Sequence, residues 1–121
     1  MSTTKPIFRI FDYHKTKEFY VDWLGFTIAW EKRFSEDSPV YMQISLGEII
    51  LHLSEHHGDG TPGSHVFIED FKGLTEFHKQ LIEKNYKYNK PGLEKAFWDE
   101  NTLTMDVVDP FNNRILFTER L

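Results

Sequence analysis

The first part of the chain has a hydrophobic pattern that predicts a strand followed by a helix. A short apolar run at residues 7–11 ends at Asp12, a residue type that caps helix N-termini well. The spacing of an amphipathic helix then appears in a run of positions three or four residues apart: Thr16, Phe19, Tyr20, Trp23 and Leu24. Gly25 follows where a left-handed C-terminal cap belongs. We therefore predict a strand that leads into one amphipathic helix.

Three strands are predicted after this helix. Apolar and polar side chains alternate over residues 26–30 and again over residues 40–44. The segment SEDSP between these two stretches is typical of a turn. A second turn, at residues 46–48 (LGE), leads into a further strand at residues 49–54 (IILHLS).

The second half of the chain repeats this order of elements. Residues 55–63 (EHHGDGTPG) contain no large apolar side chain and three glycines, so they are the best linker candidate. A strand is predicted at residues 64–70. The helical spacing then returns at Leu74, Phe77, His78, Leu81 and Ile82, and the helix is expected to close near Asn85. The remaining elements are strands at 86–89, 103–108 and 114–119, a loop at 91–101 and a turn at 109–113.

Composition narrows the classes of function. The 121 residues suit one domain, and 40% hydrophobic residues, 11 of them Phe, supply enough apolar bulk to fold and to line a cavity. A net charge of -5 without a basic run argues against a nucleic-acid partner. The absence of cysteine excludes disulfides and thiolate sites. We see neither a signal peptide nor an apolar run long enough for a membrane span, and so expect a cytoplasmic protein with no membrane partner.

Two groups of residues resemble motifs of the vicinal oxygen chelate superfamily, which comprises glyoxalases, bleomycin-resistance proteins and dioxygenases. They are Glu18-Phe19-Tyr20 with Leu24-Gly25-Phe26, and Asp109-Pro110-Phe111-Asn112-Asn113-Arg114-Ile115. The resemblance covers nearly the whole chain and implies an α+β fold of paired βαβββ modules, which form curved mixed sheets around a cavity completed in a homodimer. We expect one domain at residues 1–121, with module 1 at about 6–55, a linker at about 55–63 and module 2 at about 64–121.

The resemblance also raises the question of a metal. Metal-dependent members place four ligands on the first and last strands of the two modules, and those places fall here near Lys5 or Ile7, at His52, near His65 and at Leu116. Zinc needs at least three protein donors, and a glyoxalase needs a carboxylate at the cavity. Only His52 and His65 qualify as ligands, and they are weak metal candidates. The resemblance therefore implies the bleomycin-resistance-like branch, with no metal cofactor.

His52 is a candidate ligand contact. It shares one face of its strand with Ile50 and Ser54, while Ile49, Leu51 and Leu53 take the other face, so a ligand can reach it from the concave side. The alternative is a half-buried histidine without a role. A dense group of donors surrounds it in the sequence: Glu55, His56, His57, Asp59 and His65. Their spacing fits no standard metal site, and the intervening glycines indicate a solvated linker.

Trp98 is the second candidate for a ligand contact. It lies in a predicted loop, where lining a pocket mouth is more natural than burial, and the bleomycin-binding members of the superfamily use aromatic residues in this region for stacking. The alternative is a tryptophan that packs as a lid on its own strand. Trp30, Tyr41 and Met105 are further candidates for the cavity, although alternation alone leaves each of them facing either side.

These observations predict a non-catalytic homodimer that sequesters a flat or cationic small molecule, with a bleomycin-type glycopeptide as one candidate and antibiotic resistance as the outcome. The expected ligand contacts are His52, Trp98, His65, Trp30, Tyr41 and Met105. The alternative is a metal-dependent enzyme, a glyoxalase-like lyase, thiol transferase or dioxygenase, in which Glu55 or Glu119 joins the two histidines. A third interpretation is a domain with a filled cavity and no small ligand.

Overall fold

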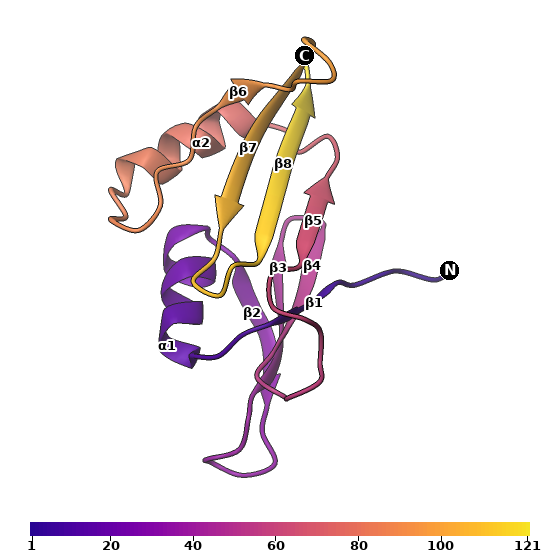
Figure 1. Ribbon diagram of the computed structural model, residues 1–121, viewed down its shortest axis with the longest axis vertical. Coiled ribbons are helices and arrows are strands. Elements are labelled where there is room, and N and C mark those ends of the chain that lie inside the picture. Colours follow the sequence, from indigo (N-terminus) through magenta and orange to yellow (C-terminus); the bar gives the residue numbers. More distant parts are fainter. The chain divides into compact units, whose positions relative to one another are not determined.

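Each half of the chain forms a four-stranded mixed sheet with one helical segment, in the order strand, helix, three strands (Figure 1). The computed structural model describes all residues, Met1–Leu121. It divides into a first unit, Met1–Ser64 with Asp109–Asn113, and a second unit, His65–Val108 with Arg114–Leu121. This is the α+β arrangement of two βαβββ modules that the sequence predicts.

The elements of the two units follow the same order. The first unit contains β1 (Ile7–Arg9), α1 (Tyr13–Thr16), η1 (Lys17–Trp23), β2 (Thr27–Lys32), β3 (Tyr41–Leu46) and β4 (Ile49–Ser54). The second contains β5 (His65–Ile68), α2 (Leu74–Glu83), β6 (Glu94–Lys95), β7 (Thr102–Val108) and β8 (Arg114–Arg120). The strand orders are β1-β4-β3-β2 and β5-β8-β7-β6, and in each sheet the first strand pairs in parallel with the last.

One face of the first sheet and the apolar side of its helix form the core of the first unit. The sheet contributes alternate residues of its two central strands, which pair across the strands as Met42 with Leu53 and Ile44 with Leu51, and all four are buried. The helix contributes Phe19, Tyr20, Trp23 and Leu24. The alternation in β3 and β4 and the helical spacing both predicted these buried positions.

The predicted first helix is present, but its longer part is a π-helix. Asp12 caps its start, because the Asp12 carboxylate accepts a hydrogen bond from the Lys15 N–H at 2.9 Å. In η1 the turns are wider, and the Leu24 N–H donates to the Phe19 carbonyl, five residues earlier, at 2.9 Å. Gly25 then has a φ of 92°, which confirms the predicted left-handed cap.

A buried carboxylate organises the turn Asp109–Asn113, which belongs to the first unit although it joins β7 to β8. Asp109 accepts hydrogen bonds from the N–H groups of Phe111 and Asn113 at 2.8 and 2.7 Å, and from the Tyr20 hydroxyl at 2.7 Å. The Asn113 side chain donates to the Arg9 carbonyl at 2.8 Å. Burial raises the pKa of Asp109, while these hydrogen bonds act against that rise. The turn therefore needs the carboxylate and the amide that its motif contains.

The second unit has its helix anchored to its last strand. The Glu119 carboxylate accepts hydrogen bonds from the Gly73 and Leu74 N–H groups, both at 3.0 Å, and so caps the start of α2. The helix ends near Asn85, whose φ is 51°, as predicted. The core side chains of this unit include Leu74, Leu81, Met105, Val107, Ile115 and Phe117. No helix in either unit has the length and apolar character that a membrane span requires.

One predicted strand is wrong. Residues 86–89 form a turn, in which the two alternating tyrosines, Tyr86 and Tyr88, contact each other with ring centroids 5.6 Å apart. The edge strand of this sheet is instead β6, which lies inside the predicted loop at 91–101 and pairs with β7. A pattern of only two alternating aromatic residues is too short to distinguish a strand from a turn.

Candidate functional site

The side of the first sheet opposite its apolar core carries two rows of side chains. Residues directly opposite each other on neighbouring strands point to the same face of a sheet. The pairing register therefore aligns Ile7, His52, Gln43 and Trp30 in one row, and Arg9, Ser54, Tyr41 and Lys32 in the next. We call the side of the sheet formed by these eight residues the open face; Ser54 is covered there and bonds to Asp59 and His56. It combines aromatic, polar and cationic groups, whereas the other face is largely apolar.

A bulge in β2 brings Trp30 to the open face. Ile28 pairs with Ile44 on the core side, whereas Trp30 pairs with Gln43, the next residue of β3, so Ala29 is an extra residue in the strand. In a regular strand Ile28 and Trp30 would share one face, because side chains alternate with a period of two. The bulge reverses the alternation at this point. The sequence pattern left the face of Trp30 undetermined, and the bulge determines it.

Three of the six predicted ligand contacts lie together on the open face. The rings of Trp30 and Tyr41 are stacked, with centroids 6.0 Å apart and an interplanar angle of 13°. His52 lies edge-on to both rings, at centroid distances of 5.4 and 5.2 Å. Trp30 remains 37% exposed, so part of its indole is free to contact a ligand.

His52 is held between two hydrogen bonds. Its Nδ1 lies 2.7 Å from the Tyr41 hydroxyl, and its Nε2 lies 3.0 Å from Gln43 Oε1. Burial, and to a lesser degree the positive charge of Lys5, lowers the pKa of the imidazole below its ordinary value of 6.5, so the ring is neutral at neutral pH. Because an amide oxygen can only accept, Nε2 carries the proton, and Nδ1 accepts from the Tyr41 hydroxyl.

Tyr41 is a hydrogen-bond donor rather than a nucleophile. Burial and then the negative charge of Asp59 raise the pKa of its phenol above 10.0, so it stays protonated. The Nδ1 lone pair of His52 is already used by this phenol. Nucleophilic catalysis needs a nucleophile with a base free to take its proton. The arrangement instead offers ring area for stacking and fixed polar groups for hydrogen bonding.

A hollow of about 510 Å³ lies beside the stacked pair. Its lining residues are Trp30, Lys32, Arg33, Phe34, Tyr41, His56 and Asp59. The volume lies within the usual range of small-molecule pockets, about 300–1,000 Å³. Phe34 is 95% exposed and lies edge-on to His56, with centroids 6.4 Å apart. The hollow therefore combines aromatic surface with charged groups of both signs.

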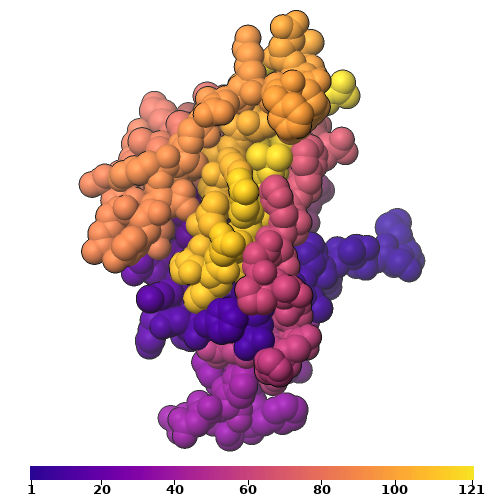
Figure 2. Space-filling view, in the orientation of Figure 1, coloured from indigo at the N-terminus to yellow at the C-terminus, as the bar shows by residue number.

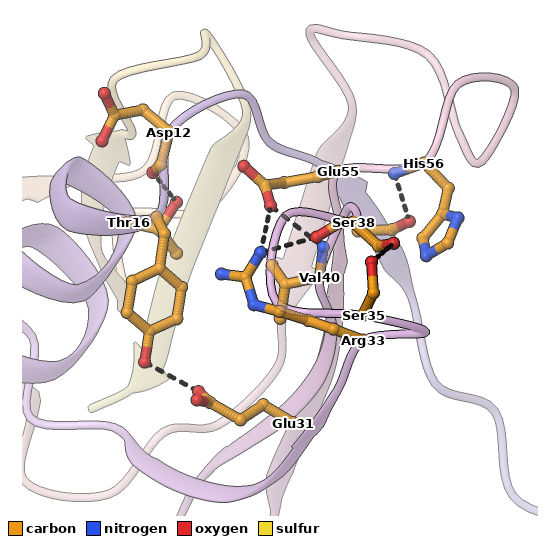
Figure 3. A network of polar contacts seen from close by, with 11 residues as sticks. Asp12, Thr16, Glu31, Arg33, Ser35, Ser38, Val40, Glu55 and His56 are labelled. Carbon is orange, nitrogen blue, oxygen red and sulfur yellow. Dashed lines mark hydrogen bonds and ion pairs between the residues drawn. The ribbon is translucent and has the colours of Figure 1, made fainter.

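The loop between β2 and β3 forms one wall of the hollow, and Arg33 fixes it. The Arg33 guanidinium donates to the Ser38 carbonyl at 2.7 Å and lies 3.7 Å from the Glu55 carboxylate, which accepts a hydrogen bond from the Val40 N–H at 3.0 Å (Figure 3). In Figure 2 this loop projects from the first unit as a purple lobe. The network ties the loop to the end of β4 and thereby positions Phe34 at the hollow.

The other three predicted contacts lie in the second unit. Trp98 is 46% exposed and touches the exposed rings of Phe67 and Phe97, at centroid distances of 5.9 and 5.0 Å. His65 is exposed on β5. Met105 is fully buried and belongs to the core of its unit, so it offers no surface to a ligand in the single chain. Alternation in β7 did not reveal which of its faces is the core face.

The side chains do not assemble a metal centre within the chain. Nowhere do three or more His, Asp or Glu residues gather in a group that could hold a metal ion. Both ring nitrogens of His52 are engaged, and Leu116 offers no donor. The two acids of the alternative enzyme are also engaged, Glu55 with Arg33 and Glu119 with the start of α2. Within the single chain, the donors of the alternative enzyme are therefore not gathered at one place, and the absence of a metal cofactor stays a prediction.

Sequence reasoning missed most of the lining of the hollow. The residues concerned are Lys32, Arg33, Phe34, His56 and Asp59. The last two come from the segment interpreted as a solvated linker, which in fact folds back on β4: the Ser54 hydroxyl donates to Asp59 at 2.9 Å and accepts from the His56 N–H at 3.0 Å. The density of polar donors at residues 55–59 was the signal available for this part of the site.

Comparison with known proteins yields one matching family. A family model described as "Glyoxalase superfamily protein" matches residues 1–121, the whole chain. No curated protein is similar enough in sequence to be matched.

Solved structures share the fold along nearly their whole length. A bleomycin-binding protein complexed with bleomycin is 19% identical, with a TM-score of 0.72 and 100% of both chains covered. A bleomycin resistance determinant encoded on the transposon Tn5 is 20% identical, with a TM-score of 0.72 and coverage of 99% of this chain and 98% of that chain. A glyoxalase family protein from Enterococcus faecalis is 19% identical, with a TM-score of 0.66 and coverage of 94% and 93%. At these identities the likeness establishes the fold.

Proposed function

For this chain, which belongs to the glyoxalase superfamily, we propose a non-catalytic function. It binds and sequesters a flat aromatic small molecule in the hollow of its first unit. The observation that carries this proposal is the stacked, partly exposed pair of Trp30 and Tyr41 beside a hollow of about 510 Å³. An aromatic ligand extends this stack, and such ring pairs contribute about 0.5–1.5 kcal/mol beyond the area that they bury.

The polar groups of the open face support the same proposal. His52 and Gln43 are held in fixed orientations by the hydrogen bonds between them and to Tyr41. Small-molecule sites combine apolar and aromatic walls with a few such fixed polar groups, which orient the ligand. On this face Nδ1 of His52 is already used by the Tyr41 hydroxyl, which favours ligand binding over nucleophilic catalysis.

The structural neighbours suggest a first candidate for the ligand. One structural neighbour is described as a bleomycin-binding protein and another as a bleomycin resistance determinant. A bleomycin-type glycopeptide is therefore the first compound to test, and resistance by sequestration is the biological role that we propose. The cytoplasmic location expected from the sequence stays a prediction.

Calorimetric titration with bleomycin and with a small set of planar aromatic compounds tests the proposal. Replacing Trp30 by Ala should weaken the best ligand about two- to tenfold, the equivalent of the stacking term. The variant should still unfold cooperatively, at a lower melting temperature, because Trp30 is 37% exposed but its ring contacts with Tyr41 and His52 are lost. Trp98→Ala is the matched control, since Trp98 is also an exposed tryptophan but lies in the second unit.

Three results are informative. Loss of affinity in Trp30→Ala alone supports the hollow of the first unit. Loss in Trp98→Ala alone moves the ligand to the second unit, where Trp98 was a candidate from the sequence, and contradicts our assignment. Unchanged affinity in both variants, or no binding of any aromatic compound to the wild type, contradicts the proposed function.

A further inference from the structure

The hollow contains one cation and one anion that no ion pair neutralises. Of its charged residues, Arg33 is paired with Glu55 at 3.7 Å, whereas Lys32 and Asp59 take part in none of the ion pairs of the structure. The Lys32 ammonium lies 5.8 Å from the centroid of the Trp30 ring. The Asp59 carboxylate accepts a hydrogen bond from Ser54. The aromatic site is therefore flanked by two unpaired charges of opposite sign.

The pairing register places the two charged groups on either side of Tyr41. Lys32 lies directly opposite Tyr41, and Tyr41 lies directly opposite Ser54, whose hydroxyl holds the Asp59 carboxylate at 2.9 Å. Neighbouring strands are about 4.8 Å apart, so the Cα atoms of Lys32 and of Ser54, which holds Asp59, lie roughly 10 Å apart with Tyr41 between them. The negative charge of Asp59 also raises the pKa of Tyr41, which is consistent with a carboxylate close to that ring.

We propose that the ligand of this hollow is an aromatic zwitterion: a rigid ring system with an acidic group at one end, which meets Lys32, and a protonated amine at the other end, which meets Asp59. The proposal rests on the proposed function, because it specifies the chemistry of the ligand at the same aromatic site. A purely cationic ligand leaves Lys32 without a partner, and a purely anionic ligand leaves Asp59 without one. Only a ligand with both charges satisfies the two ends of the hollow.

Four biphenyl probes of matched size test this specificity. The first carries a carboxylate at one end and an aminomethyl group at the other. The second replaces the carboxylate by a primary amide, the third replaces the aminomethyl group by a hydroxymethyl group, and the fourth makes both replacements and is neutral. Binding is measured by calorimetry. We expect the zwitterion to bind most tightly, and each lost charge to weaken binding about 1.4- to fivefold, the range measured for exposed ion pairs.

Charge-removing variants assign each end of the probe. Lys32→Met should weaken only the two probes with a carboxylate, and Asp59→Asn only the two probes with an amine. Lys72→Met and Asp70→Asn are matched controls, because Lys72 and Asp70 form an ion pair in the second unit, and these variants should change none of the affinities.

The outcomes separate this inference from the proposed function. Equal affinity for all four probes, lost in Trp30→Ala, overturns the zwitterion and leaves the aromatic site standing. Preference for a singly charged probe over the zwitterion also overturns it. Failure of every probe and of bleomycin to bind the wild type overturns both proposals.

Discussion

His52 connects the polar groups of the open face because its two nitrogens act in opposite senses. Nδ1 accepts from the Tyr41 hydroxyl, and Nε2 donates to the Gln43 side chain. Only a neutral imidazole can do both, since an imidazolium donates from both nitrogens. Burial and the charge of Lys5 lower the pKa of the ring and so favour this neutral form. Protonation of His52 therefore removes the acceptor that Nδ1 offers to the Tyr41 hydroxyl.

The pH dependence of stability follows from this pKa. In the folded protein the pKa of His52 lies below its value in the unfolded chain, about 6.5, so the unfolded state binds more protons in the window between the two. The free energy of unfolding should therefore fall as the pH falls from about 6.5 towards the folded-state pKa, and rise again as the pH is raised. Urea unfolding at a series of pH values measures the slope.

A comparison of two glutamine variants isolates the contribution of His52. His52→Gln should show a shallower loss of stability over this pH window than the wild type. His57→Gln, at an exposed position of the segment between β4 and β5, should keep the wild-type slope. If the profile of His52→Gln runs parallel to that of the wild type, the neutral imidazole does not control the pH dependence.

The bulge in β2 determines which face of the sheet Trp30 points to, and the hydrophobic pattern of the strand does not reveal it. Before the bulge an even-numbered residue, Ile28, faces the core, whereas after it an even-numbered residue, Trp30, faces the other side. The change occurs because Ala29 has no partner on β3. The strand thereby packs Ile28 towards the core and presents Trp30 on the open face. Without the extra residue, the same two side chains would occupy adjacent positions and still point to opposite faces.

This geometry makes an unusual deletion tolerable. Removing one residue from a regular strand moves every following side chain to the opposite face, which is normally ruinous when one face is buried. Removing Ala29 should instead convert the bulge into a regular pairing, with Trp30 still opposite Gln43. We expect the variant to fold and to bind the aromatic ligand of the wild type. Removing Ile50 from β4, whose pairing with β3 has no bulge, should abolish cooperative thermal unfolding, because four following residues change faces. Loss of the fold in the Ala29 deletion would contradict this account.

At the scale of the molecule, the sheets remain open at their edges. Each four-stranded sheet ends in two outer strands, β1 and β2 in one unit and β5 and β6 in the other, and none of these closes a barrel within its sheet. Unpaired edges and an exposed aromatic face are features that proteins commonly cover by association with a second copy. We therefore keep the prediction of a two-fold homodimer.

Sedimentation velocity tests this prediction directly. The chain has a mass of 14.4 kDa, and we expect a species of about twice that mass at micromolar concentration, with a melting temperature that rises with protein concentration. Multi-angle light scattering over a dilution series provides an independent measure. A single 14.4 kDa species throughout that range would count against the dimer.

The sequence by itself determined the order of the elements and much of the core. The cap at Asp12, the left-handed Gly25 and the alternation in β3 and β4 are local features, because capping and side-chain periodicity depend on residues within one or two turns. The same locality explains why the face of His52 was predicted correctly. The motifs at Glu18-Phe19-Tyr20 and Asp109–Asn113 indicated the family. In the structure the Asp109 carboxylate accepts hydrogen bonds from the Tyr20 hydroxyl and the Asn113 N–H, so the two motifs meet at a buried turn.

Only the tertiary structure decided the composition of the site. Whether Trp30 faces the ligand depends on a bulge that exists only when β2 pairs with β3. The hollow depends on Arg33 and Asp59, which reach it through contacts with Glu55 and Ser54 that no periodicity encodes. Met105 shows the same limit, because strand alternation separates two faces without saying which one is buried. Register and loop closure are long-range properties, and they determined which side chains meet.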